Sequence, residues 1–195
     1  MAAGNWTRRL VIATVCAAAF AAQAAYPDKP IKIIVPGVAG GSPDVLTRLI
    51  GNELSKKLGQ PVVIDNKGGA GGNIGIQALV SSVPDGYTLA YGNNATLTTN
   101  EFLFSRLPYN PQTLVLVGGI ATTSSFLLVN NSVPAKTVAE LVAYGKKADK
   151  PLQYGSGGIG TTSHLGAELF KAKMGLQPAE HSPYKGPPQA MGDSM

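Results

Sequence analysis

The apolar positions of the chain alternate between two periods. Short β-branched runs predict strands, and each is followed by a loop rich in glycine or asparagine and then by apolar residues at helical spacing. Strands are predicted at 31–35, 61–65, 87–91, 114–120, 125–129, 152–154 and 179–182. Helices are predicted at 44–58 (with Asp44 as its cap), 73–82, about 96–104, 137–148 (with Thr137 as its cap), 161–174, and after 186.

Strands that alternate with helices predict an α/β protein with mostly parallel sheets and crossover connections. Ligands of such folds bind beyond the carboxyl ends of the strands. Four polar loops are expected there, at 37–43, 67–72, 92–96 and 155–160. The stretch 114–131 is typical of a crossover between two lobes, so we expect a first lobe at 25–120 and part of a second at 121–195.

The N-terminus predicts export. Arg8 and Arg9 precede an apolar run from Leu10 to Ala22, and the small-x-small sequence 22–24 follows. This order is that of a secretory signal peptide covering residues 1–24. An uncleaved membrane anchor is the alternative, but the run is short for a membrane-spanning helix. The expected location is the periplasm.

The composition of the mature chain excludes several function classes. Without the two arginines of the signal peptide, 14 basic residues face 11 acidic ones, a net charge of +3. This small, scattered excess is not that of a nucleic-acid-binding protein. The single cysteine, Cys16, lies in the signal peptide, and the two histidines lie 17 residues apart, so we expect neither a metal site nor a cofactor.

The loops offer chemistry suited to an anion. Each places backbone N–H groups at a helix N-terminus, where they lack partners within the helix and the helix dipole adds partial positive charge. Polar side chains add further donors: Ser42, Asn73, Asn93, Thr96, Ser156, Thr161, Thr162 and Ser163. The same loops also end strands in many α/β proteins that bind nothing there, so a secreted protein without a small-molecule ligand is a further alternative.

The loop 155–160 also matches G-x-G-x-x-G, and Glu180 follows Gly160 by 20 residues. This is the dinucleotide-binding pattern, which makes a nucleotide-dependent enzyme the alternative function. Export argues against it, because an exported protein meets little NAD. His164 is interpreted as a cap or packing residue rather than a general base. Tyr184 and Lys185 could line a pocket or cover a surface loop.

Nine motifs in order carry a family resemblance. They are Tyr26–Ile31, Gly40-Gly41 with Asp44, Gly69–Gly75, Pro84–Leu89, Leu107–Tyr109, Ser132–Lys136, Tyr154–Gly157, Thr162–Leu165 and Pro183–Gly186. Together they resemble the Bug family of extracytoplasmic receptors, the substrate-binding subunits of tripartite tricarboxylate transporters. The resemblance covers nearly the whole mature chain.

The resemblance implies a fold like that of type II periplasmic binding proteins, with two α/β lobes of which the second is incomplete here. It implies a monomeric, non-enzymatic receptor that binds a small carboxylate and delivers it to the permease subunits. The residues expected to line its cleft are Gly40, Gly41, Ser42, Asp44, Gly71, Gly72, Asn73, Asn93 and Thr96, and in the second lobe Ser156, Gly157, Thr161, Thr162, Ser163, His164, Tyr184, Lys185 and Gly186.

Three features depart from the family pattern. Gly37 replaces an aromatic residue that usually follows the first-strand proline, and Gly68 replaces a frequent proline. Family members also run to roughly 300 residues or more, whereas this sequence has 195. We therefore expect a gene fragment or incomplete product with weak or no transport function.

Overall fold

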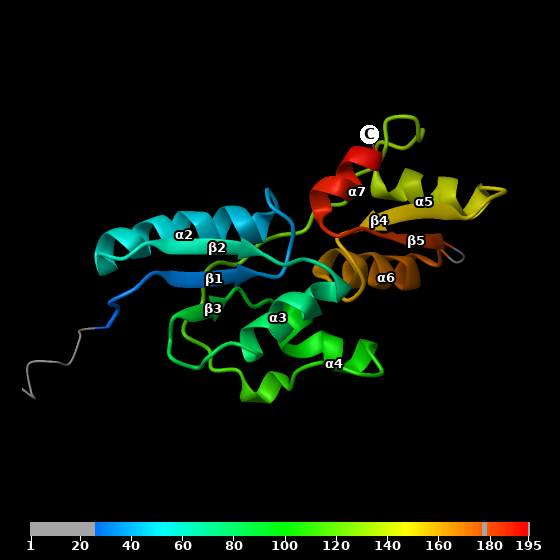
Figure 1. The fold of residues 1–195 in the computed structure, drawn as a ribbon. Helices are drawn as coiled ribbons and strands as arrows, with labels where there is room; N and C mark the ends of the chain where they lie inside the picture. The colour runs from blue at the N-terminus through cyan, green and yellow to red at the C-terminus, as the bar shows by residue number, and fades with distance from the viewer. Residues whose placement is uncertain (1–25, 177–178, 195) are drawn as a thin grey trace, which may run out of the picture.

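The computed structural model describes residues 26–176 and 179–194, so the predicted signal peptide at 1–24 lies outside the described residues. Two groups of strands and helices lie side by side along the long axis of the molecule (Figure 1). The first group contains β1–β3 and the second β4 and β5. None of the helices in the described part of the chain is long and apolar enough to cross a membrane.

The first lobe is built on a three-stranded parallel sheet of order β2-β1-β3. The strands are β1 (Ile31–Val35), β2 (Val62–Asn66) and β3 (Thr88–Ala90). Four of the five residues of β1 are buried apolar residues, which is the composition of a central parallel strand covered on both faces. β1 is therefore the central strand of the sheet, and β2 and β3 pair with it on either side.

Helices flank this sheet at the positions where apolar periodicity predicts them. They are α2 (Ser42–Leu58), α3 (Asn73–Val80) and α4 (Asn100–Leu103), with the short helical turns η1 (Ala70–Gly72), η2 (Ala95–Thr99) and η3 (Pro111–Thr113). The cap prediction for α2 was wrong. The helix begins at Ser42 after Gly41, so Asp44 lies inside its first turn.

The strands predicted at 114–120 and 125–129 are absent. The backbone there crosses from the first lobe to the second (Figure 1) and pairs with no strand of the described residues. Its side chains lie in solvent; Val115 is 89% exposed and Phe126 is 84% exposed. A β-branched run favours extended backbone, but a strand also needs a neighbour to pair with. The crossover itself was predicted.

The second lobe has two parallel strands, β4 (Leu152–Ser156) and β5 (Ala179–Pro183). Its helices are α5 (Val138–Lys147), α6 (Thr162–Met174) and α7 (Pro187–Ser194). Thr137 caps α5 as predicted, because its hydroxyl accepts the Glu140 N–H at 3.2 Å while the Glu140 carboxylate accepts the Lys136 N–H at 2.7 Å. These two hydrogen bonds satisfy backbone N–H groups at and just before the start of α5.

Two helical glycines provide a test of this packing. A Cβ on Gly75 in α3 would lie 2.8 Å from the Pro36 Cβ and 3.0 Å from the Lys67 carbonyl oxygen, whereas one on Gly166 in α6 would meet nothing within 4 Å. We expect Gly75→Ala to lower the free energy of unfolding by about 1–3 kcal/mol and Gly166→Ala to raise it by about 0.5–1 kcal/mol. Urea unfolding followed by circular dichroism measures both; equal effects would contradict the packing.

Candidate functional site

A cavity of about 210 Å³ lies where the two lobes meet. The first lobe contributes Pro36, Gly69, Ala70, Gly71, Gly72, Asn93 and Phe104 to its lining. The second lobe contributes Gly157, Gly158, Ile159, Thr161, Pro183, Tyr184 and Lys185. Both sets follow the carboxyl ends of strands, where an open parallel sheet binds its ligands.

The first-lobe wall is a run of four residues with left-handed backbone, 69–72, directly before α3. Three are glycines, and the fourth, Ala70, has φ +48°. A non-glycine residue in this region costs on the order of 1 kcal/mol or more, and such strain gathers at ligand-binding loops. The run presents successive backbone groups to the cavity at the positive end of the α3 dipole.

The second-lobe wall is the loop that precedes α6, and it lies close against the first lobe. The Ile159 carbonyl oxygen is 2.8 Å from where a Cβ on Gly71 would lie, and Asn100 Oδ1 is 2.7 Å from where one on Gly160 would lie. Thr162 Oγ1 also donates a hydrogen bond of 2.9 Å to Asn94 Oδ1 across the lobes. Glycine at 71 and 160 therefore permits an approach of the two backbones that a side chain would block.

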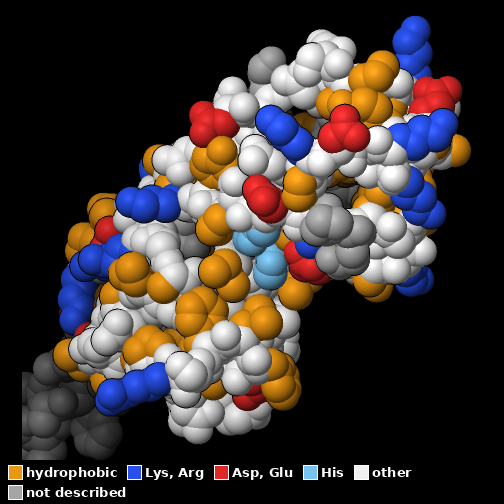
Figure 2. All heavy atoms as spheres, turned by 90° about the vertical axis from the view of Figure 1, so that its right-hand side faces the viewer, with side chains coloured by type: hydrophobic (Ala, Val, Ile, Leu, Met, Phe, Trp, Pro, Cys, Tyr) orange, Lys and Arg blue, Asp and Glu red, His pale blue; other side chains and the backbone are white. Residues whose placement is uncertain are grey.

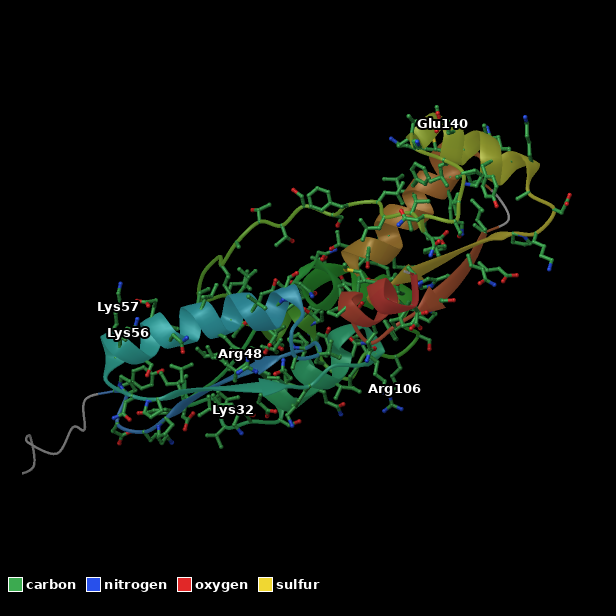
Figure 3. The ribbon with its side chains drawn as sticks, turned by 90° about the horizontal axis from the view of Figure 1, so that it is seen from above. Lys32, Arg48, Lys56, Lys57, Arg106 and Glu140 are labelled. Atoms are coloured by element: carbon green, nitrogen blue, oxygen red, sulfur yellow. The ribbon has the colours of Figure 1, made fainter. Side chains whose placement is uncertain are left out.

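The cavity combines apolar walls with one cationic side chain. Phe104 and Ile159 are apolar lining residues, and Lys185 carries the only formal charge among the lining residues found in the described chain. Other cationic side chains of the first lobe lie away from the cavity lining, among them Lys32, Lys56, Lys57 and Arg106 (Figure 3). No carboxylate side chain lines the cavity, so its electrostatics favour an anion.

The structure places the predicted site residues in two groups. Seven line the cavity, namely Gly71, Gly72, Asn93, Gly157, Thr161, Tyr184 and Lys185. The remaining eleven do not line it. Six make hydrogen bonds in or across the loops around it, namely Asn73, Thr96, Ser156, Thr162, Ser163 and His164, and Gly186 follows the lining residue Lys185. The other four, Gly40, Gly41, Ser42 and Asp44, lie at the start of α2. The role of either group in binding a ligand remains a prediction.

The Asp44 carboxylate places a negative charge of the protein itself at the N-terminus of α2. Its carboxylate accepts the Gly40 N–H at 2.9 Å and pairs with Arg48, whose Nη2 lies 2.9 Å from Oδ1. The Arg48 hydrogen bond, followed by that from Gly40, lowers the pKa of Asp44 to about 2. The 37–41 loop thus already holds a carboxylate of the protein itself, which an external anion there would meet.

Two further predicted donors are held inside the first lobe. Asn73 Oδ1 accepts hydrogen bonds from Asn100 Nδ2 at 2.6 Å and from the Tyr109 hydroxyl at 3.1 Å. Thr96 accepts the Asn93 N–H through Oγ1, and its own N–H donates to Asn93 Oδ1. The sequence indicated Tyr109 only through its motif, and it missed Asn100, because no local pattern distinguishes a buried asparagine from a surface one.

The second-lobe loop rests on a cluster of polar side chains. Ser163 Oγ accepts the Gly157 N–H at 3.0 Å, His164 Nδ1 accepts the Gly160 N–H at 3.2 Å, and Ser156 Oγ lies 2.7 Å from His181 Nε2. His181 did not figure in the sequence prediction because it comes from β5, far from the loop along the chain. The two histidines are visible in the narrow middle of the molecule (Figure 2).

The dinucleotide alternative finds no support in this geometry. Glu180 pairs in register with Gln153 of β4, two residues before the loop 155–160, and its carboxylate accepts a hydrogen bond from that side chain. Gly160 lies against Asn100 and is not open to a pyrophosphate. The cavity of about 210 Å³ is also below the roughly 300–1,000 Å³ that drug-sized ligands occupy.

Two parallel α/β lobes with a cavity between their glycine-rich loops define a two-lobed solute-binding protein. Residues 46–195 match the family model described as the tripartite tricarboxylate transporter family receptor, and the chain belongs to this family. The resemblance inferred from the nine motifs is thereby confirmed, as is the fold class. The family is one of receptors, in agreement with the prediction of a non-enzymatic protein.

Known relatives extend this assignment. The chain is 38% identical over 184 residues to a UPF0065 protein of Bordetella pertussis, covering 94% of this chain and 57% of the relative. It is 35% identical to protein BugT of the same organism, covering 98% of this chain and 60% of BugT. The chain thus spans somewhat over half the length of the curated relatives it matches.

Solved structures show the same fold. An R. palustris protein determined with adipate superposes with a TM-score of 0.83 at 35% identity, covering 87% of this chain and 56% of that one. MatC from Rhodopseudomonas palustris, with bound malate, superposes with a TM-score of 0.72 at 27% identity, covering 87% and 57% of the two chains.

The carboxylate of Asp44 gives a testable pH dependence. Folding lowers its pKa from 3.8 to about 2, so its stabilisation is complete above about pH 4 and is lost as the pH falls through 2. We expect Asp44→Asn to lower the free energy of unfolding by about 1–2 kcal/mol at neutral pH. The difference from wild type should shrink below about pH 4. Urea titrations across this range measure it.

The control for this experiment is Asp149→Asn, which removes the same charge from an exposed position after α5. It should change the free energy of unfolding by less than about 0.5 kcal/mol. A deficit of Asp44→Asn that stayed constant down to pH 2 would contradict the assigned ion pair.

Proposed function

We propose that this protein is the solute-binding receptor of a tripartite tricarboxylate transporter and binds a small carboxylate in the cavity between its lobes. The single observation that carries the proposal is the cavity itself. The loops before α3 and α6 line it from opposite sides, and Lys185 supplies its one charge among the described lining residues.

The chemistry of the cavity supports an anionic ligand with an apolar middle. Backbone amides and the positive ends of two helices suit a carboxylate without an arginine. Phe104 and Ile159 suit the methylene groups between two carboxylates. Relatives of known structure carry adipate and malate, which are both dicarboxylates, so a dicarboxylate is the proposed ligand class.

The rest of the proposal concerns location and partners. A periplasmic location follows from the predicted signal peptide and from the periplasmic transport proteins among the structural relatives. The receptor would act as a monomer and deliver its ligand to the permease subunits of the transporter. The boundary between its two lobes would lie near residue 120. Since the chain spans somewhat over half of its relatives, the transport activity of the whole protein is part of the proposal.

The ligand class can be tested on the purified chain with adipate and with NAD. A ligand that binds only the folded state stabilises it by RT ln(1 + [L]/Kd), about 2.7 kcal/mol at 100-fold excess over Kd. We expect adipate to raise the melting temperature and NAD to leave it unchanged. Stabilisation by NAD alone would favour the nucleotide-dependent enzyme, and no shift with either compound would count against the receptor.

Lys185→Gln tests the charge at the cavity. The substitution should weaken adipate binding roughly three- to tenfold, because a charge-assisted contact is lost in a partly solvated site. Lys173→Gln on the exposed surface of α6 removes the same formal charge away from the cavity lining. Isothermal titration calorimetry should find the control within twofold of wild type; equal losses in both variants would indicate only a long-range charge effect.

A further inference from the structure

Two stacked histidines lie behind the second-lobe wall of the cavity. The rings of His164 from α6 and His181 from β5 have centroids 4.3 Å apart at an interplanar angle of 24°. Tyr154 of β4 also stacks on His181, with ring centroids 4.8 Å apart. Each histidine contacts a different part of the loop 156–160, and neither lines the cavity itself.

The contact with Gly160 fixes the protonation state of His164. The Gly160 N–H donates to Nδ1 at 3.2 Å, so this nitrogen carries a lone pair and the ring is neutral, with its proton on Nε2. An imidazolium has protons on both nitrogens and cannot accept this bond. The hydrogen bond therefore exists only while His164 is uncharged.

His181 acts on the same loop through a serine. Ser156 is 2% exposed, its Oγ lies 2.7 Å from His181 Nε2, and it accepts the Gly158 N–H at 3.1 Å. The ring stack thus holds the N–H groups of both Gly158 and Gly160. Ile159 lies between these two glycines and lines the cavity against Gly71 of the first lobe.

The charged groups around the pair oppose a second positive charge. Lys171 is buried and its Nζ pairs with the Glu168 carboxylate at 2.8 Å, and Glu168 also accepts a hydrogen bond from the Tyr154 hydroxyl. The pKa of Glu168 is lowered by its hydrogen bonds from Lys171 and Tyr154, so its charge is balanced by that of Lys171. Burial is the main cause that lowers the pKa of His181, and the Glu168 carboxylate acts in the opposite direction.

We propose that His164 is a positioning residue of the ligand site: as a neutral imidazole it holds the Gly160 amide and keeps the loop 157–161 in its cavity-lining shape, so that its protonation weakens ligand binding. This inference deepens the proposed function and rests on it. A cationic side chain near an anion site is expected to strengthen binding, so the opposite sign distinguishes positioning from simple charge attraction.

Two substitutions distinguish the hydrogen-bond acceptor of His164 from the rest of its imidazole ring. His164→Asn places an amide oxygen near the position of Nδ1 and does not titrate, whereas His164→Leu removes the acceptor. By calorimetry with adipate at pH 8 we expect His164→Asn to bind within twofold of wild type and His164→Leu about fivefold more weakly, which corresponds to one hydrogen bond of about 1 kcal/mol.

The pH profile is the second readout. As the pH is lowered from 8 the wild type should lose more affinity than His164→Asn, because an imidazolium cannot accept the Gly160 N–H whereas the asparagine oxygen still can. Protonation of adipate affects both proteins equally and cancels in the comparison. Equal pH profiles, or tighter binding by the wild type at pH 6, would overturn the proposal.

A third readout needs no ligand. In ¹H–¹⁵N spectra of the wild type, the Gly160 amide resonance should shift as acid removes the imidazole acceptor, and in His164→Asn it should not. A Gly160 resonance that ignores pH in the wild type overturns the inference even where the variants fail to fold. If the Gly160 amide resonance shifts with pH but adipate does not bind, the result supports the positioning of the loop and overturns the proposed function instead.

Discussion

The close approach of two backbones across the cavity is the constraint on which the site depends. Gly71 and Gly160 stand where a side chain would meet the Ile159 carbonyl oxygen and the Asn100 side chain of the opposite lobe. Because nothing larger than hydrogen fits there, the loops before α3 and α6 come near enough to enclose one small cavity. The hydrogen bond from Thr162 to Asn94 adds a specific polar contact to the same interface.

The loops reach this close approach because their polar side chains make hydrogen bonds within the protein. Most of the polar side chains in the loops are engaged within the protein: Asn73 with Asn100 and Tyr109, Ser163 with the Gly157 amide, and His164 with the Gly160 amide. Buried polar groups need such partners, because an unpaired one costs on the order of 1–3 kcal/mol. The side chains therefore shape the loops that line the cavity, and the amides of Gly157 and Gly160 are engaged in holding that shape.

The alternation of strands and helices could be predicted because β1 and the amphipathic helices carry their period in local sequence. The strands predicted at 114–120 and 125–129 failed, since strand pairing depends on residues elsewhere in the chain. For the site, the glycine loops and Lys185 were indicated by composition and motif. Phe104, Ile159 and His181 were not, because their roles arise from the docking of the lobes and from the register of β4 with β5.

The N-termini of α2 and α6 differ in the groups that accept their amides, and this difference supports the ligand position proposed above. At α2 the chain supplies its own anion, since the Asp44 carboxylate accepts the Gly40 N–H and is held ionised by Arg48. At α6 the corresponding amides are held by neutral acceptors, Ser163 and His164. The dipole of α2 is thus already compensated, whereas that of α6 is not, and an incoming carboxylate gains most at the uncompensated end. The cavity lies against the loops before α6 and α3, and none of its described lining residues carries a carboxylate side chain that would repel such a ligand.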